Sequence, residues 1–113
     1  MSAGALEALE RTLGGSGEPD DVLREAVAVL ASEPGIEWAG IAFLDEGMLV
    51  LGPTAGNPDE SRRVSVPIVF HDSRIGELWI DGRAERPLLE RAAALLSELV
   101  LIGWDTQGEA WDP

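Results

Sequence analysis

His71 is the first side chain to consider for chemistry, because it is the single histidine and an imidazole titrates near neutral pH. Asp72 and Ser73 complete the residue types of a nucleophilic triad, but a triad needs side chains that converge from separate elements. These three are consecutive and lie in a predicted turn, where polar residues have a structural use. The chain has no cysteine, which excludes thiolate catalysis, disulfides and the tightest zinc sites. We therefore expect no catalytic residue and no enzymatic activity.

Several acidic residues are candidates for holding a divalent cation, namely Asp45, Glu46, Asp59, Glu60, Glu77 and Asp81. None has the regular spacing of a calcium loop, and a chain with 21 acidic residues brings some together by chance. The glycines and prolines between Gly52 and Pro58 suggest a phosphate-binding loop, but the P-loop lysine and hydroxyl are missing and the nearby acids repel anions. We expect no metal site and a solvated acidic surface.

The charge of the chain restricts its partners. Eight basic residues against 21 acidic ones give a formal net charge of −13, and this negative field repels phosphate backbones and acidic membrane leaflets. The first twenty residues contain no sustained apolar stretch, so neither a secretory leader nor a membrane span is expected there. We expect a soluble cytoplasmic protein of bacterial type, with no nucleic-acid or membrane partner.

The pattern along the chain predicts helices at both ends and four strands between them. Leu6, Leu9 and Leu13 have the spacing of one helical face, and a second amphipathic helix is expected over residues 21–32. Short turns such as Glu46-Gly47 join the strands and force antiparallel hairpins. The expected strands are Trp38–Asp45, Met48–Gly52, Arg63–Phe70 and Arg74–Asp81, and the last helix is expected over about Arg86–Ile102.

Three segments follow from this division. Residues 1–17 are an N-terminal helix with a glycine-rich joint, residues 18–103 are the folded domain, and residues 104–113 are a C-terminal tail. We expect Gly103 to end the last helix, and the tail to fold back because Trp104 and Trp111 would be costly to leave in water. The fold class is therefore α+β, an antiparallel sheet with N- and C-terminal helices packed on one face.

Alternation predicts one apolar and one mixed sheet face. In the third strand Val64, Val66, Ile68 and Phe70 share the apolar face. In the fourth strand Ile75, Glu77, Trp79 and Asp81 share the other face. Trp79 is the most interesting side chain, because an exposed indole beside apolar neighbours often marks a contact site. The alternative is that the tail or the 54–62 loop covers Trp79, so that its indole is buried in a small core within the same chain.

Two hairpins carry a family resemblance. The first is Trp38-Ala39-Gly40-Ile41-Ala42-Phe43-Leu44 leading to Leu49-Val50-Leu51-Gly52-Pro53, and the second is Val64-Ser65-Val66-Pro67-Ile68 leading to Ile75-Gly76-Glu77-Leu78-Trp79-Ile80-Asp81. In their order and spacing they resemble the strands of the GAF domain, a relative of the PAS fold, and most closely its free methionine sulfoxide reductase branch. The resemblance spans about residues 21–102, which makes 18–103 a GAF-like domain. It implies a small-molecule sensing or regulatory module.

Two departures from the family pattern qualify what the resemblance implies. Family members that hold a nucleotide, a tetrapyrrole or an oxidised methionine generally insert a helical lid after the second strand, whereas only residues 54–62 lie there in this chain. Nine residues cannot enclose a ligand that needs a cavity of about 300 Å³ or more. The reductase branch works through cysteines that this chain lacks. We therefore expect no cofactor and no reductase activity.

Two hypotheses from different classes remain. The first is a non-catalytic GAF-like regulatory or protein-interaction module that forms a homodimer through its terminal helices, because the last helix is apolar over more than half its circumference; its candidate interface residues are Leu6, Leu9, Leu95 and Leu99. The second is a small-molecule sensor with a shallow pocket bounded by Ile41, Val66, Ile75 and Trp79, with the 54–62 loop as its rim. An enzyme is the third and least supported class.

Overall fold

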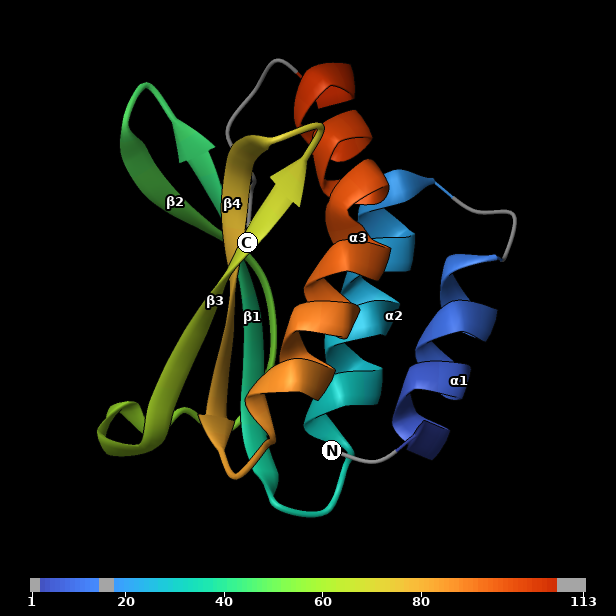
Figure 1. Cartoon of the computed structure of the whole chain (residues 1–113), viewed down its shortest axis with the longest axis vertical. Helices are drawn as coiled ribbons and strands as arrows, with labels where there is room; N and C mark the ends of the chain where they lie inside the picture. The colour runs from blue at the N-terminus through green and yellow to red at the C-terminus, as the bar shows by residue number, and fades with distance from the viewer. Residues whose placement is uncertain (1–2, 15–17, 108–113) are drawn as a thin grey trace.

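The computed structural model describes residues 3–14 and 18–107, which form a four-stranded sheet and three long helices (Figure 1). Among these residues no helix combines the length and the apolar character needed to cross a membrane. In chain order the elements are α1 (Ala3–Leu13), α2 (Pro19–Ala31), β1 (Ile36–Asp45), β2 (Met48–Gly56), the 3₁₀ turn η1 (Glu60–Arg62), β3 (Arg63–Phe70), β4 (Ser73–Gly82) and α3 (Arg86–Gln107).

The sheet has the strand order β2-β1-β4-β3, and every neighbouring pair is antiparallel. Two-residue turns close both hairpins. Glu46 and Gly47 join β1 to β2, while His71 and Asp72 join β3 to β4, and all four have positive φ, as a turn matched to the twist of a hairpin requires. The predicted hairpins are therefore confirmed, with His71 exposed in its turn. The central pair β1–β4 joins the two hairpins without a direct connection.

Both edge strands are interrupted. In β2 the register with β1 shifts between Leu51 and Thr54, where Gly52 and Pro53 form an irregularity. In β3 the exposed Pro67 interrupts the strand, and the register with β4 shifts between Ile68 and Val69, where Ile75 is the extra residue on β4. Proline has no N–H to offer, and a bulge bends the strand, so neither edge presents a regular ladder.

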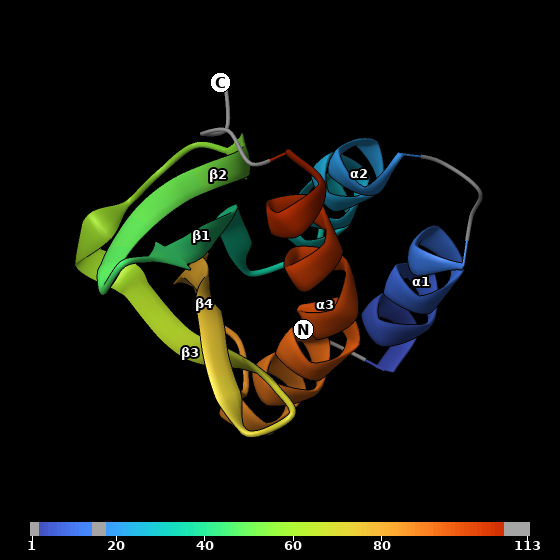
Figure 2. The same ribbon diagram turned by 90° about the horizontal axis from the view of Figure 1, so that it is seen from above.

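The helices form two layers on one face of the sheet (Figure 2). α2 and α3 pack directly on the strands, and α1 packs on α2 and α3 as an outer layer. The core lies between the sheet and α2 and α3, because the buried stripe of α2 (Leu23, Ala26, Val27, Leu30) faces the inward residues of the strands. Val66 and Ile68 of β3 and Leu78 and Ile80 of β4 are fully buried there, as alternation predicts.

Two elements, α3 and β2, end several residues later than predicted. α3 continues past Gly103 to Gln107, because a single glycine inside a helix costs only about 1 kcal/mol and does not by itself stop it. β2 continues to Gly56, because pairing with Trp38, Ala39 and Gly40 of β1 supplies partners for Thr54 and Ala55. The predicted folding back of the tail falls on residues 108–113 and on side chains beyond Val100, which lie outside the described part of the structure.

The N-terminal helix belongs to the same core as the rest of the chain. Leu9 is 0% exposed and Leu6 is 8% exposed, and both join the cluster that contains the sheet residues. Leu6 and Leu9, which we predict as interface residues, are thus buried against α2 and α3 of their own chain, and their part in an interface between two copies stays a prediction. Leu95 and Leu99 on α3 are half-buried and pack at the border of this core.

Candidate functional site

The face of the sheet opposite the helices carries a cluster of polar and aromatic side chains, which we call the outer-face cluster: Trp38, Arg63, Glu77, Trp79 and Asp81. Strand register builds it. Asp81 of β4 lies opposite Trp38 of β1 on one side and opposite Arg63 of β3 on the other. In the next row Trp79 lies between Gly40 and Ser65, two small residues that leave room for large neighbours. The cluster therefore spans three strands.

Arg63 lies between the two indoles. Its guanidinium carbon is 4.5 Å from the centroid of the Trp38 ring and 5.3 Å from that of the Trp79 ring, within the range of a cation–π interaction. The Trp38 indole runs along its own strand over Gly40, where a Cβ atom would come within 2.5 Å of the ring. Glycine at position 40 is therefore what lets the indole lie flat on the sheet.

Asp81 fixes Arg63 in this position. Its two carboxylate oxygens accept hydrogen bonds from Arg63 Nε at 2.7 Å and from an Arg63 terminal nitrogen at 2.9 Å, and the Asp59 backbone N–H donates a third bond at 2.6 Å. The Asp81 side chain is 0% exposed, whereas that of Arg63 is 23% exposed. Burial disfavours the charged carboxylate, but these hydrogen bonds and the charge of Arg63 outweigh it, so the pKa of Asp81 is lowered.

Several other polar groups of the outer face are also paired. Trp79 Nε1 donates to a Glu77 oxygen at 2.8 Å, and Arg74 pairs with the other oxygen of the same carboxylate. Arg62 pairs with Glu37. Arg62, Arg63 and Arg74 thus all pair with carboxylates of the chain itself.

The chemistry available to this cluster is limited. Asp81 stays ionised and uses both oxygens for internal hydrogen bonds, so it is not a free base or nucleophile. His71 lies exposed in the β3–β4 turn, with its ring against Phe70. Within the described residues no group of three or more histidine, aspartate or glutamate side chains is placed to hold a metal ion. What the cluster offers is a pre-ordered aromatic and cationic surface.

The four predicted pocket residues do not come together. Ile41 and Val66 are 0% and 1% exposed in the core beneath the helices, and Ile75 also packs against that core. Trp79 alone lies in the outer-face cluster. We predicted that Ile75 shares the face of Trp79, which is wrong. The register of β4 with β3 shifts beside Ile75, so the alternation of side chains between the two faces breaks at that end of β4.

The segment between β2 and β3 lies along one end of the sheet. It is shorter than predicted, because β2 takes residues up to Gly56. The Asn57 N–H donates to the Glu37 carbonyl at 2.9 Å, the Asp59 N–H donates to Asp81, and η1 contacts β4. These bonds tie the segment to the ends of β1 and β4.

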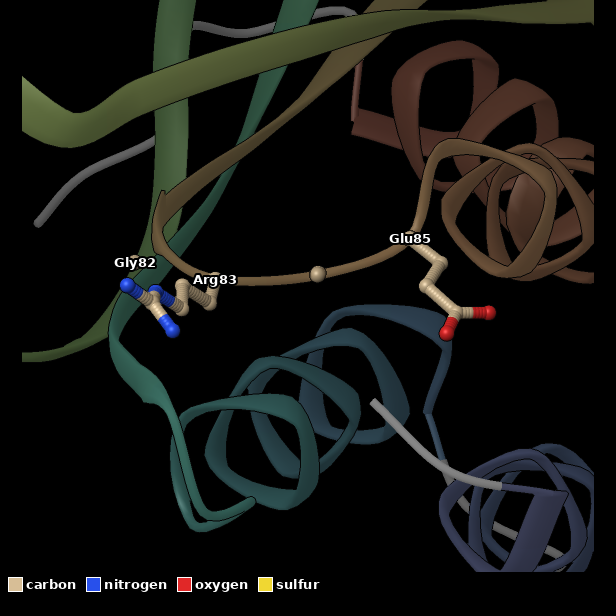
Figure 3. Close-up of a pocket in the computed structure, with 4 residues that line it drawn as sticks. Gly82, Arg83 and Glu85 are labelled. Atoms are coloured by element: carbon tan, nitrogen blue, oxygen red, sulfur yellow. The ribbon is translucent and has the colours of Figure 1, made fainter.

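Two surface cavities of about 450 Å³ each are lined by residues outside the outer-face cluster. The first is lined by Gly82, Arg83, Ala84 and Glu85 of the connection between β4 and α3 (Figure 3). Its walls come from one short stretch of chain with exposed charged side chains, and the Arg83 N–H bonds to the Gly35 carbonyl at 2.8 Å. The second cavity lies between α1 and α3.

No protein-family model matches the sequence, and no curated protein matches it. Several solved structures do match. The GAF domain of the Acinetobacter phosphoenolpyruvate-protein phosphotransferase is 16% identical with a TM-score of 0.70, over 96% of this chain and 100% of that chain. The reduced form of fRMsr of Staphylococcus aureus is 19% identical with a TM-score of 0.68, over 85% and 92%. Free methionine-R-sulfoxide reductase from Neisseria meningitidis, in complex with its substrate, is 16% identical with a TM-score of 0.69, over 94% and 95%.

This chain therefore has a GAF-like fold, and the predicted fold class is confirmed: α+β, with a four-stranded antiparallel sheet and its helices on one face. The resemblance that the strand blocks suggested is confirmed at the level of the fold. At these low identities the likeness defines architecture alone, and the function must be argued from the residues.

Proposed function

We propose that this chain is a non-catalytic GAF-like regulatory or protein-interaction module that forms a homodimer through its terminal helices. The observation that carries the proposal is the outer-face cluster. Arg63 occupies the space between two indoles and is held there by the buried Asp81, so the chain's own side chains fill the open face of the sheet. Such a face offers a binding surface and does not enclose a ligand cavity.

The energy of the Arg63–Asp81 pair supports this proposal. A ligand that entered between the indoles would have to displace Arg63 and leave the carboxylate of Asp81 buried without its cation. Breaking a buried pair in this way costs about 3–5 kcal/mol, which a small ligand would have to supply before gaining any affinity. A partner protein that docks over the cluster meets no such cost. Tryptophan and arginine are also the residues enriched at the centres of protein interfaces.

The neighbours in fold point to two roles, and the residues favour one. One neighbour from Burkholderia vietnamiensis is described as a putative GAF sensor protein, and others are free methionine-R-sulfoxide reductases. The reductase branch works through cysteines, whereas this chain has none. Its acidic groups in the outer-face cluster are committed to internal ion pairs. A regulatory role through binding is therefore the better supported of the two.

A ligand panel tests the non-catalytic part of this proposal. We would follow thermal unfolding and tryptophan fluorescence with a panel of small metabolites that includes methionine sulfoxide, and would assay the same panel for turnover. Because binding to the folded state raises its apparent stability, a ligand would reveal itself as a raised midpoint. We expect no shift and no turnover. A single metabolite that raises the midpoint and changes the indole fluorescence would overturn the proposal.

The alternative is a small-molecule sensor with a shallow pocket beside Trp79 and residues 57–62. Trp79 is half-buried and the Arg63 side chain keeps 23% of its surface exposed, so a small ligand could contact both without full displacement of the pair. Trp79→Phe keeps an aromatic ring, although a smaller one, and removes the N–H that bonds to Glu77. Under this alternative the variant would lose the response to the metabolite, whereas Met48→Ala, a change at an exposed hairpin residue, would keep it.

The dimer is tested by sedimentation at micromolar concentration. We expect a dimer that Leu99→Glu converts to a monomer, because a charge placed in an apolar seam is not compensated. Circular dichroism would show that the variant remains folded. Leu95 and Leu99 are half-buried, so they retain apolar surface for a second copy. A wild-type chain that stays monomeric at about 100 µM, a concentration high enough to populate all but the weakest dimers, would remove this part of the proposal.

A further inference from the structure

Exposed apolar side chains lie on the outer face of the sheet, beside the outer-face cluster. In the described part of the chain the large apolar residues left exposed are Met48, Leu51 and Val69. Leu51 is 46% exposed and Val69 is 44% exposed, although each belongs to a strand of the sheet. Exposed apolar side chains that gather on one face mark an interaction site more often than isolated ones do.

Strand register shows that these two residues share the outer face. Leu51 of β2 is the partner of Ala42 of β1, and Ala42 is the partner of Glu77 in the outer-face cluster. On the other side of Glu77 its partner is the exposed Pro67 of β3, and Val69 follows Pro67 by two residues on the same face. We call the apolar residues of the two edge strands on this face the outer strip: Leu49, Leu51, Pro67 and Val69.

The centre of the outer strip is neutral and one end of it is acidic. Arg74 and Glu77 of β4 lie between its two halves and pair with each other. Both hairpin turns lie at the same end of the sheet (Figure 1), and each exposes a carboxylate, Glu46 in one turn and Asp72 in the other. Neither carboxylate has an ion-pair partner within residues 3–14 and 18–107. Apolar surface therefore adjoins two unpaired negative charges.

We infer that the outer strip docks a basic amphipathic helix of a partner protein, with the apolar side of that helix on the strip and its lysine or arginine side chains over the two hairpin turns. The inference rests on the proposed interaction role and names the chemistry of the partner. A helix of this kind is anchored by apolar side chains at positions i, i+3 or i+4, and i+7.

The dimensions of the sheet suit a helix laid across the strands. Between β2 and β3 there are three inter-strand spacings of about 4.8 Å, which makes roughly 14 Å. Because a helix rises about 1.5 Å per residue, side chains from i to i+7 or i+11 span about 10–17 Å and reach both halves of the strip. Addition of a strand is disfavoured, because Pro53 and Pro67 interrupt the two edges.

Charge favours a basic partner over the chain's own segments. The net charge of −13 attracts a cationic partner at long range, and Glu46 and Asp72 attract it at the strip itself. A second copy carries the same negative charge. Residues 104–113 contain three acidic side chains and no lysine or arginine, so their charge also has the wrong sign.

The experiment measures binding of a synthetic peptide by fluorescence anisotropy. The peptide has about 14 residues of leucine and lysine, with the leucines on one helical face, and carries a fluorescent label. One comparison peptide has the same composition with the leucines spread around the helix, and another has glutamate in place of lysine. We expect the basic amphipathic peptide to have a dissociation constant at least about tenfold lower than either comparison peptide.

A double variant tests the apolar part of the outer strip. Leu51→Thr with Val69→Thr removes apolar contact and keeps residues that suit a strand, so we expect the dissociation constant of the peptide to rise at least about fivefold. Met48→Thr is the control, because Met48 is 72% exposed but alternates with Leu49 onto the other face of the sheet. It should change the constant by less than about twofold. Circular dichroism and thermal unfolding verify that each variant is folded.

A second double variant tests the acidic end of the strip. Glu46→Gln with Asp72→Asn removes two charges, and we expect it to raise the dissociation constant about three- to tenfold and to reduce its dependence on salt. Glu7→Gln with Glu10→Gln is the matched control, because it removes the same charge from exposed positions of α1, in the helix layer that lies away from the sheet (Figure 2). General attraction of a cation to an acidic protein would be weakened equally by both pairs.

Support for the inference requires that both strip variants weaken binding and that both controls do not. A basic peptide that fails to bind at about 1 mM, or that binds the strip variants and the controls equally well, overturns it. Tighter binding of the acidic peptide also overturns it, as does a wild-type dimer that dissociates when Leu51 and Val69 are replaced, since a second copy would then occupy the strip. The metabolite panel judges the non-catalytic role separately, so the two failures are distinguishable.

Discussion

Asp81 is the residue on which the outer face of the sheet depends. Its carboxylate is fully buried and accepts three hydrogen bonds, two from Arg63 and one from the backbone of Asp59. Through Arg63 it also fixes the two indoles. A buried ion pair adds little over a well-packed apolar pair, but losing one partner alone is costly because the other charge remains. Asp81 therefore orders the cluster more than it stabilises the chain by net energy.

Asp81→Asn should lower the free energy of unfolding by about 2–4 kcal/mol. The amide keeps the shape of the carboxylate but cannot hold the charge of Arg63, which makes the loss larger than that of a neutral hydrogen bond. Urea denaturation measures the change. Glu60→Gln is the control, because Glu60 is 3.9 Å from Arg63 but 85% exposed, and we expect a change within about 0.5 kcal/mol. If Asp81→Asn and Glu60→Gln had the same free energy of unfolding, the Arg63–Asp81 ion pair would not be what stabilises the outer-face cluster.

The lowered pKa of Asp81 gives this pair a pH dependence of known sign. In the folded chain the carboxylate releases its proton at a lower pH than in the unfolded chain, where aspartate has a pKa of about 3.9. The unfolded state therefore binds the extra proton in acid. The stability from this group is complete above that ordinary pKa and is lost as the pH falls through the folded value.

We therefore expect the stability difference between wild type and Asp81→Asn to shrink as the pH falls from about 6 to below 4. Subtracting the two curves removes the contributions of the other acidic groups, which both chains share. Urea denaturation at each pH gives the curves. A difference that stayed constant, or that grew towards acid pH, would mean that Asp81 is not the ionised partner of Arg63.

The candidate site could be predicted from the sequence only in part. Trp79 stood out because an exposed indole beside apolar neighbours often marks a contact site. The site residues Trp38 and Asp81 were not assigned, because β1 and β4 are joined by no hairpin and their register cannot be counted from a turn. Counting back from the His71-Asp72 turn would pair Arg63 with Ile80, and the register shift after Ile68 moves it to Asp81. A one-residue irregularity thus created the ion pair.

At the scale of elements, α1 is the helix whose role the sequence left most open. The strands were predicted to within a few residues, since turn signals and alternation both come from the local sequence. Helical spacing also identified α1, but the same leucines could serve either a core or an interface. Only the tertiary packing decides, and the structure places Leu9 against α2 and α3 with 0% exposure.

Leu9→Ala should therefore lower the free energy of unfolding by about 2–5 kcal/mol, through the lost apolar burial and the cavity left behind. Arg11→Ala on the same helix is the control, since Arg11 is exposed, and should change it by less than about 0.5 kcal/mol. Denaturation at two protein concentrations separates core from interface. If the effect of Leu9→Ala vanished at low concentration, Leu9 would act between copies and not within one.

At the scale of the whole molecule, the net charge of −13 opposes compactness. Five of the arginines pair with acids in the described part of the chain, so most other acids repel one another through solvent. Salt shortens the reach of this repulsion from about 30 Å at 0.01 M to a few ångströms at 1 M. The Arg63–Asp81 pair is shielded from solvent and is screened much less.

We expect the thermal midpoint to rise by several degrees when sodium chloride increases from about 10 mM to about 0.5 M, because screening relieves the repulsion of the folded state. Arg83→Glu makes the net charge more negative without touching an ion pair of the described residues, so its midpoint should rise more steeply. Differential scanning calorimetry at fixed protein concentration gives both slopes. A midpoint that fell with salt would mean that attractive pairs dominate the electrostatics.

The interrupted edges of the sheet decide how this module grows into larger assemblies. Pro53 with the irregularity beside it interrupts the β2 edge, and Pro67 interrupts the β3 edge. An incoming strand therefore finds no continuous ladder along either edge, which disfavours growth of fibrils by strand addition. Tandem copies or fused neighbours must attach by helices or termini, so quaternary architecture can diversify while the sheet stays a closed unit.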